Sequence, residues 1–236
     1  MTKIPSYFNW SGGKDSTLAL HKILEEGKYD VKYLLTTANQ DHHRVAMHGV
    51  RLELMQEQAN SLGIPLVIIK YSSSATMEEY ENAMSKGIQP ILGEGIRTAI
   101  FGDIFLEDLK EYRVKKLLEI GVEAVFPLWK INTSELINEF VELGYKTILV
   151  CTDNSKLDGS FVGKTIDKAL VQKLPESVDP CGENGEFHTF VYDGPIFKKK
   201  VEFTIGEVVE RHYQGKTSEK EEKDWGFLFV DLLPMR

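Results

Sequence analysis

The chain has 236 residues, 42% of them hydrophobic, which suffices for one large domain or for a domain with a smaller partner. A formal net charge of −8 gives no strong signal for nucleic-acid binding, and no apolar run approaches the ~20 residues that cross a bilayer. Residues 1–10 lack the apolar core of a signal peptide, so we expect a cytoplasmic protein that does not enter a membrane.

The first half of the chain alternates short apolar strands with amphipathic helices. The predicted strands are residues 6–10, 31–37, 65–71, 98–104 and 124–127. The predicted helices are a segment through Leu18 and Leu24 that ends at Gly27, then residues 50–62, 77–84 and 109–120. Because right-handed crossovers place helices on both faces of such a sheet, the pattern predicts a doubly wound, parallel, five-stranded α/β sheet of the Rossmann-like type. Ligands of such sheets bind at the carboxyl ends of the strands.

A different pattern begins after Trp129. Asn132 with Glu135 predicts a capping box for a helix over residues 134–143, and a strand follows at 147–152. The remaining predicted elements are antiparallel strands at 186–192, 201–212 and 226–232, a turn at 193–195 and an exposed loop at 215–224. We therefore expect two domains, residues 1–130 and a smaller α+β domain of residues 131–236.

A glycine loop between the first strand and the first helix has the chemistry of an anion cradle. Its residues are Ser11, Gly12, Gly13, Lys14, Asp15 and Ser16. The two glycines let the backbone approach phosphate oxygens, and the serine hydroxyls add donors. Lys14 can neutralise charge that develops on departing pyrophosphate, while Asp15 can help to hold Mg²⁺.

This loop is not a Walker A loop, which needs four residues between its glycines and a Ser or Thr directly after Lys. Residues 159–165, GSFVGKT, imitate that motif with only three residues between the glycines, so a turn that caps a helix starting near Thr165 is favoured there. The string SGGKDS instead resembles the PP-loop of the ATP pyrophosphatases, which cleave ATP to AMP and pyrophosphate. A glycine turn with a helix cap would explain Gly12 and Ser16 but not adjacent Lys14 and Asp15.

Further segments extend the resemblance over almost the whole chain. They are MHGV at 47–50, GDI at 102–104 with Glu107 and Asp108 just after, EAVFPLW at 123–129 and DPCGENGEFHT at 179–189. Together they are similar to the diphthine ammonia ligase family of PP-loop proteins. The resemblance implies an enzyme that uses ATP and Mg²⁺ to adenylate a carboxylate, releases pyrophosphate and forms an amide with ammonia or an amine. In archaeal and eukaryotic members the carboxylate belongs to diphthine on elongation factor 2, whereas for a bacterial member the acceptor is open.

The resemblance and the residue types together give a candidate site. The catalytic candidates are Lys14, Asp15, Glu186 and His188, and the metal ligands are Asp15 and Asp103. The nucleotide should contact the loop residues Ser11, Gly12, Gly13, Lys14, Asp15 and Ser16, together with Thr37, His48 and Gly102. The acceptor should contact Asp103, Cys181, Gly182, Glu183, Asn184, Gly185, Glu186, His188 and Thr189. Arg44 and Arg51 are further candidates for phosphate contacts.

Several of these residues also have structural interpretations. A strand-terminal aspartate such as Asp103 is a frequent cap, Cys181 fits a buried thiol, and residues 181–189 fit a glycine-rich hairpin. At the level of the whole protein, a PP-loop enzyme acting on a tRNA base predicts a basic surface or paired cysteines, and the sequence has neither. A non-catalytic ATP sensor would need no organised second segment at 181–189. The oligomeric state is open, with a homo-oligomer as one alternative.

Overall fold

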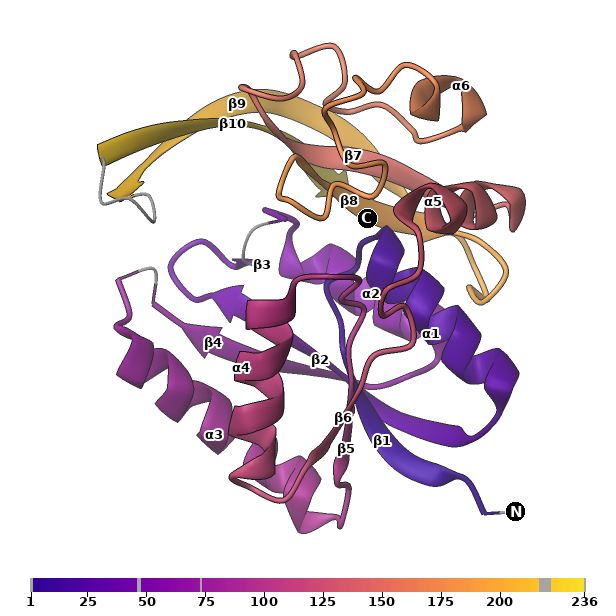
Figure 1. The fold of residues 1–236 in the computed structure, drawn as a ribbon, viewed down its shortest axis with the longest axis vertical. Coiled ribbons are helices and arrows are strands. Elements are labelled where there is room, and N and C mark those ends of the chain that lie inside the picture. Colours follow the sequence, from indigo (N-terminus) through magenta and orange to yellow (C-terminus); the bar gives the residue numbers. More distant parts are fainter. Residues whose placement is uncertain (1, 46–47, 73, 217–221, 236) are drawn as a thin grey trace.

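The computed structural model describes residues 2–45, 48–72, 74–216 and 222–235. Its backbone forms two β-sheets, one largely parallel and flanked by helices, the other antiparallel (Figure 1). The first sheet contains β1 (Ile4–Asn9), β2 (Tyr29–Asn39), β3 (Arg44–Val45), β4 (Leu66–Tyr71), β5 (Thr98–Ile100) and β6 (Glu123–Val125). Its five parallel strands run in the order β4-β2-β1-β5-β6, and the two-residue β3 pairs antiparallel with the end of β2. The predicted five-stranded parallel sheet is therefore confirmed.

This strand order places β1 beside both β2 and β5, so the order reverses at β1. In doubly wound sheets the crevice at that reversal, beyond the carboxyl ends of the strands, is where ligands bind. The glycine loop directly follows β1 and leads into α1 (Lys14–Glu26), which ends at Gly27 in the left-handed conformation. The fold thus brings the predicted anion cradle to the topological switch point.

Three more helices cover the parallel sheet, namely α2 (Leu52–Leu62), α3 (Met77–Gly93) and α4 (Glu107–Leu118). α3 begins with a reciprocal capping box between Thr76 and Glu79. It runs well past the predicted end at residue 84, because its last turns bury Ile88, Ile91 and Leu92 under the sheet.

The second sheet has the order β8-β7-β10-β9, with every neighbouring pair antiparallel. Its strands are β7 (Lys146–Asp153), β8 (Phe187–Asp193), β9 (Phe203–Lys216) and β10 (Glu222–Pro234). The short helix α6 (Lys168–Val171) and the helix α5 (Thr133–Glu142) accompany it, and Asn132 caps α5 by accepting hydrogen bonds from the amides of Ser134 and Glu135. The antiparallel character predicted after Trp129 is confirmed.

Three local predictions were wrong. The strand predicted at 98–104 ends at Ile100, because residues 101–104 turn away to meet α1 and the loop that precedes β8. The loop predicted at 215–224 is in part strand, since β9 and β10 pair as far as Lys216 and Glu222, and residues 217–221 lie outside the described part of the chain. No helix starts near Thr165, which forms a β-bridge with Ile148, and α6 starts instead after its cap Asp167.

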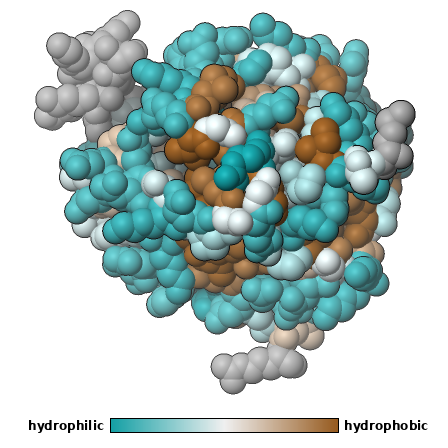
Figure 2. Space-filling view, turned by 90° about the horizontal axis from the view of Figure 1, so that it is seen from below, coloured by the Kyte–Doolittle hydropathy of each residue, from teal (hydrophilic) through white to brown (hydrophobic). Residues whose placement is uncertain are grey.

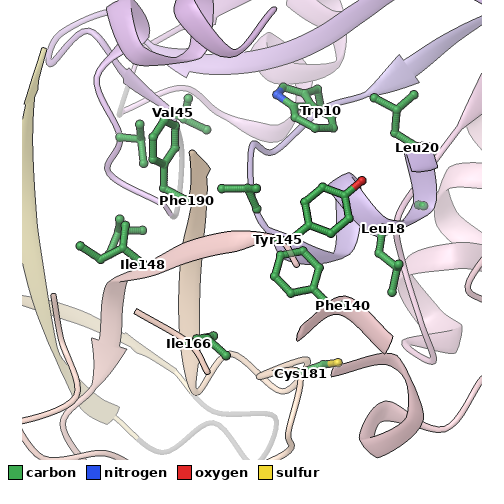
Figure 3. Close-up of a cluster of buried hydrophobic side chains, with 14 of the residues drawn as sticks. Trp10, Leu18, Leu20, Val45, Phe140, Tyr145, Ile148, Ile166, Cys181 and Phe190 are labelled. Atoms are coloured by element: carbon green, nitrogen blue, oxygen red, sulfur yellow. The ribbon is translucent and has the colours of Figure 1, made fainter. Parts of the chain in front are cut away.

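One hydrophobic core joins the two sheets. Trp10 and Leu18 from the first part of the chain lie in the same buried cluster as Phe140, Tyr145 and Phe190 from the second (Figure 3). Tyr145 stacks on Phe140, and its hydroxyl pairs with Nδ1 of His21 in α1 at 2.8 Å. Because these contacts are buried, α1 and the second sheet are held in a fixed relation at the glycine loop.

The side remote from the second sheet is mostly hydrophilic, with apolar patches that break its surface (Figure 2). Leu118 at the end of α4 is 65% exposed. None of the helices in the described ranges combines the length and apolar character needed to cross a membrane.

Gln58 in α2 is a buried polar link between the two parts of the chain. Its side-chain carbonyl accepts from Nε1 of Trp10 at 2.9 Å, and its Nε2 donates to the carbonyls of Gly12 at 2.9 Å and Val191 at 2.5 Å. We predict that Gln58→Leu lowers the free energy of unfolding by about 2–4 kcal/mol, because it removes three buried hydrogen bonds and takes away the acceptor of Trp10 Nε1.

Urea unfolding followed by tryptophan fluorescence measures this loss. Gln56→Leu on the exposed face of the same helix, where only Asn60 is a partner, is the matched control and should change stability little. Equal effects of the two substitutions would contradict the role of Gln58.

Candidate active site

The glycine loop is shaped by close packing on three sides. Gly12 has φ of +77°, and a Cβ there would lie 2.7 Å from Oε1 of Gln58. At Gly13 a Cβ would lie 2.9 Å from Cε1 of His48 and 3.1 Å from the carbonyl oxygen of Thr189. Any larger residue would push these groups apart, so space requires glycine at both positions, and the positive φ of Gly12 requires it by conformation as well.

The hydroxyls of the loop close it upon itself. Ser11 Oγ accepts from the amide of Gly13 at 3.3 Å and donates to Ser16 Oγ at 3.0 Å, and Ser16 Oγ donates to the carbonyl of Gly13 at 2.9 Å. Gly102 lies against the same turn, where an added Cβ would be 2.9 Å from the amide nitrogen of Ser16. The start of α1, where the positive end of the helix dipole lies, is therefore held in place by these contacts.

Lys14 connects the loop with the segment that the sequence analysis assigned to the second domain. Its side chain is only 3% exposed, and its ammonium contacts the Asp15 carboxylate at 2.7 Å and donates to the carbonyl of Cys181. The same ammonium lies 5.2 Å from the centre of the Phe187 ring. Burial lowers the pKa of Lys14, but the charge and hydrogen bond of Asp15, together with Cys181 and Glu183, outweigh burial and hold the pKa above its ordinary value. A charged ammonium group therefore lies buried between the glycine loop and the segment that contains Cys181.

Two carboxylates, half-buried Asp179 and buried Glu186, organise the loop that contains Cys181. Asp179 accepts from the amides of Cys181 at 2.9 Å and Glu183 at 3.2 Å. Glu186, only 2% exposed, accepts from the amide of Asp179 at 3.1 Å and from both the amide and the side chain of Asn184. Its oxygens are therefore engaged in hydrogen bonds within the loop, and the catalytic role expected from the sequence stays a prediction. Gly182 and Gly185 provide the left-handed turns of this loop, with φ of +65° and +87°.

Strand β8 carries Thr189 and His188 to the glycine loop. Thr189 Oγ1 accepts from the amide of Lys14 at 3.0 Å, and the Thr189 carbonyl pairs with Nδ1 of His48 at 3.0 Å. The imidazoles of His48 and His188 lie 4.6 Å apart with an interplanar angle of 34°. Burial lowers the pKa of His48 to about 4 and that of His188 well below its ordinary value, so both rings are neutral at physiological pH. Neutral imidazoles beside the loop can exchange hydrogen bonds without repelling Lys14.

Glu183 and Asp103 approach the loop from opposite parts of the chain. Glu183 Oε1 accepts from the amide of Ile104 at 2.9 Å, and burial together with the negative charge of Asp15 raises its pKa to about 7. Asp103 pairs with Arg113 at 2.9 Å. Its pKa is nevertheless raised by burial, with a further contribution from the charge of Asp15. Three acidic groups therefore influence one another beside a single lysine.

Other predicted residues lie elsewhere. Thr37 lies in β2, and its side chain forms a hydrogen bond with that of Tyr71 in the neighbouring strand β4. Arg44 and Arg51 form ion pairs with Asp231 of β10, at 2.9 Å and 2.6 Å, so their guanidinium groups are not free to bind phosphate in this structure. This double pairing lowers the pKa of Asp231 to about 2. The buried thiol of Cys181 donates to the carbonyl of Thr133, and burial raises its pKa, so it is a structural thiol.

The contacts of Gln58, Asp179 and Arg113 were not predicted from the sequence. Asp179 begins the segment 179–189, and its side chain accepts from the amide of Cys181, two residues later. An aspartate that bonds in this way is a turn signal that can be found in the sequence. Gln58 and Arg113 act through contacts distant in the sequence, with Trp10, Val191 and Asp103, which no local pattern announces.

A magnesium ion fits this donor set only together with a nucleotide. In the part of the chain that the structure describes, no three His, Cys, Asp or Glu side chains converge as a ready metal group. Asp15 and Asp103 offer hard oxygen donors, and their mutual charge already disfavours both being ionised. Because Mg²⁺ is commonly held by one or two carboxylates plus phosphate oxygens, these two residues suit a metal brought by a nucleoside triphosphate.

Comparison with known proteins agrees with this geometry. Residues 6–124 match the family described as diphthamide synthase N-terminal domain, and residues 132–230 match the diphthamide synthase C-terminal domain. The chain is 26% identical over 223 residues to diphthine–ammonia ligase of Rattus norvegicus, in an alignment that covers 84% of this chain and 82% of the relative.

Two other diphthine–ammonia ligases match over shorter stretches. The protein of Schizosaccharomyces pombe is 32% identical over 123 residues, which is 50% of this chain and 20% of the relative. That of Homo sapiens is 30% identical over 110 residues, which is 44% of this chain and 41% of the relative. The aligned part of the chain thus spans less than half the length of these two relatives.

The raised pKa of Glu183 predicts a specific dependence of stability on pH. Between the ordinary glutamate pKa of 4.5 and about 7, the folded chain keeps a proton that the unfolded chain releases. The stability of the wild type relative to Glu183→Gln should therefore fall as pH rises through this window and level off above it.

Urea unfolding from pH 4.5 to 8 checks the sign and the window. Glu176→Gln, at an exposed position, is the control and should follow the wild type at every pH. A stability difference between wild type and Glu183→Gln that does not change with pH would show that Glu183 ionises normally.

Proposed function

Because the chain belongs to the diphthine ammonia ligase family, we propose that it is an ATP-dependent ligase that adenylates a carboxylate and converts it to an amide with ammonia or an amine. The observation that carries this proposal is the buried Lys14 ammonium, which contacts Asp15 of the glycine loop and the carbonyl of Cys181. One cation thereby touches both the nucleotide cradle and the segment that we assign to the acceptor. We further propose that residues 1–130 bind ATP and residues 131–236 bind the acceptor.

The first half-reaction makes the carboxyl carbon reactive. An oxygen of the carboxylate attacks the α-phosphorus of ATP, the bond to the β-phosphate bridging oxygen breaks, and pyrophosphate leaves with its electron pair. Lys14 and the amides at the start of α1 stabilise the negative charge that accumulates on this leaving group. Because Lys14 is buried, its interaction with that charge is stronger than it would be in water.

The proposed cofactors are ATP and Mg²⁺. Asp15 and Asp103 are the residues that would hold the metal ion, which would neutralise phosphate charge when bound with ATP. Arg113 keeps Asp103 oriented through their ion pair.

The second half-reaction needs a base. The nitrogen of ammonia or an amine attacks the acyl carbon, AMP departs with the electron pair of the acyl–oxygen bond, and the nitrogen loses a proton. We propose Glu183 as the group that takes this proton, because a pKa of about 7 balances its ionised fraction with its basicity at neutral pH. Neutral His188 and His48 supply hydrogen bonds that orient the nucleophile, and Glu186 holds the loop in place.

The alternatives fit the geometry less well. A tRNA-modifying enzyme needs a basic surface, yet Lys199 and Lys200 of the densest basic run pair with Glu57 and Glu202. A sensor without turnover needs no second segment, whereas residues 181–189 contact the glycine loop through Lys14 and Thr189. For the acceptor, we propose a carboxylate of the diphthine class, which is what the relatives' names specify.

Products of ATP cleavage test the first half-reaction. With ammonium and elongation factor 2 that bears diphthine, ATP should give AMP and pyrophosphate rather than ADP and phosphate. Lys14→Ala should lower AMP formation by about 10²-fold or more, the effect of losing one preorganised charged group. Lys86→Ala, at an exposed position of α3, should leave the rate unchanged. Chromatography that finds ADP as the main product would contradict the proposal.

A second variant separates the two half-reactions. Glu183→Gln should lower amide formation by about 10²-fold, because it removes the general base. It should change pyrophosphate exchange, which reports adenylation alone, by no more than a few-fold. In the wild type, amide formation should rise with pH up to about 7 as Glu183 loses its proton.

Glu176→Gln serves again as the exposed control. Equal losses of exchange and amide formation in Glu183→Gln would place Glu183 in the nucleotide site and refute its role as the base.

A further inference from the structure

The hairpin of β9 and β10 presents an aromatic face. The cross-strand pairs Trp225 with Tyr213 and Phe227 with Arg211 are directly opposite one another, so their side chains lie on the same side of the hairpin. The Tyr213 and Phe227 rings are 5.9 Å apart, edge to face. We call Arg211, Tyr213, Trp225 and Phe227 the hairpin face.

This face continues the wall of the candidate active site. In the second sheet His188 pairs with Cys151, and Cys151 pairs with Phe229, so these three share a side with Phe227. The Phe229 ring packs on Gly49, where an added Cβ would be 2.9 Å from the ring, and the ring of the neighbouring His48 lies 4.6 Å from that of His188. A row of side chains therefore runs from the imidazoles beside the glycine loop outward along the hairpin.

The two sides of the hairpin differ in what covers them. On the opposite side, Leu228 and Val230 approach Gly159 and Gly163 of the segment that follows β7. On the hairpin face Tyr213 is 53% exposed, and Arg211 is exposed with no ion pair to any residue that the structure describes. Figure 1 shows the hairpin extending beyond β7 on the side of the molecule where β3 lies. Tyr213 and Arg211 therefore lie exposed next to the site, and Arg211 has no ion pair within the described ranges of the chain.

We propose that the hairpin face docks a polypeptide segment of the acceptor, with an acidic side chain of that segment on Arg211; this inference rests on the proposed function. Tyrosine, tryptophan, phenylalanine and arginine are the residues enriched in the centres of protein interfaces. Trp225 lies about 14 Å along the strand from Phe229, farther than a small carboxylate at the glycine loop would reach. Nucleic acid is disfavoured by the net charge of −8.

Photo-crosslinking in the full chain identifies the occupant. p-Benzoylphenylalanine replaces Tyr213 in one variant and Val208 in the control, which is a residue of β9 that is 50% exposed and whose side chain lies on the other side of the hairpin. In cells of the source organism, the probe at 213 should yield an adduct with a polypeptide that the probe at 208 does not. Equal adducts from both positions, an RNA adduct, an adduct with a second copy of the chain, or no adduct would each overturn the proposal.

The polypeptide identified by cross-linking is then purified in its free form and used as the substrate in kinetic measurements, which complete the test. It should stimulate AMP and pyrophosphate release by the wild-type chain with ammonium present. Combined Arg211→Ala and Tyr213→Ala should raise the KM for this polypeptide by about 10-fold or more, while the Kd for ATP stays within about twofold. Val208→Ala should leave both unchanged. An unchanged KM with intact AMP formation would overturn the docking surface alone, whereas a wild-type chain that forms no AMP would overturn the ligase function.

Discussion

The packing of β8 against the glycine loop is the contact on which the site depends. The Val191 amide donates to the Gly12 carbonyl at 2.9 Å, and the Lys14 amide donates to Thr189 Oγ1 at 3.0 Å. Gln58 donates to the Gly12 and Val191 carbonyls and so ties both sides together. Because all of these groups are buried, leaving one unpaired would cost about 1–3 kcal/mol. The parallel sheet and the antiparallel sheet therefore act as one scaffold, and residues far apart in the sequence converge with fixed geometry.

That scaffold concentrates charge in a place from which water is largely excluded. The Lys14 ammonium faces Asp15, whose negative charge raises the pKa values of Asp103 and Glu183, and Asp103 adds to the rise at Glu183. The adjacent imidazoles of His48 and His188 are kept neutral by burial. In this arrangement the polyanionic nucleotide and a metal ion would complete the charge balance, which gives a physical reason for ATP and Mg²⁺ to bind together.

The second sheet serves the site in two ways. Asp231 of β10 holds Arg44 and Arg51, and these residues flank the segment that contains His48. The sheet thereby positions one histidine from the first part of the chain and supplies the other, His188, from β8. The same side of the sheet then continues outward as the hairpin face, so the proposed nucleotide site, nitrogen site and acceptor-docking surface would lie along one continuous surface.

The sequence by itself determined the parallel architecture and the nucleotide loop. Both rest on local signals, since strand and helix periods appear within ten or so residues and SGGKDS is contiguous at the switch point. The boundary near residue 130 stays a prediction. Only the tertiary structure decided that Cys181 and Thr189 contact Lys14. It also decided that Arg44 and Arg51 form ion pairs with Asp231. Within one loop, it engages Glu186 with backbone amides and places Glu183 near Asp15. Glu183 and Glu186 are three residues apart in one glycine-rich segment, so composition treats them alike. Their roles separate because the fold buries one among backbone amides of its own loop and places the other beside the charge of Asp15.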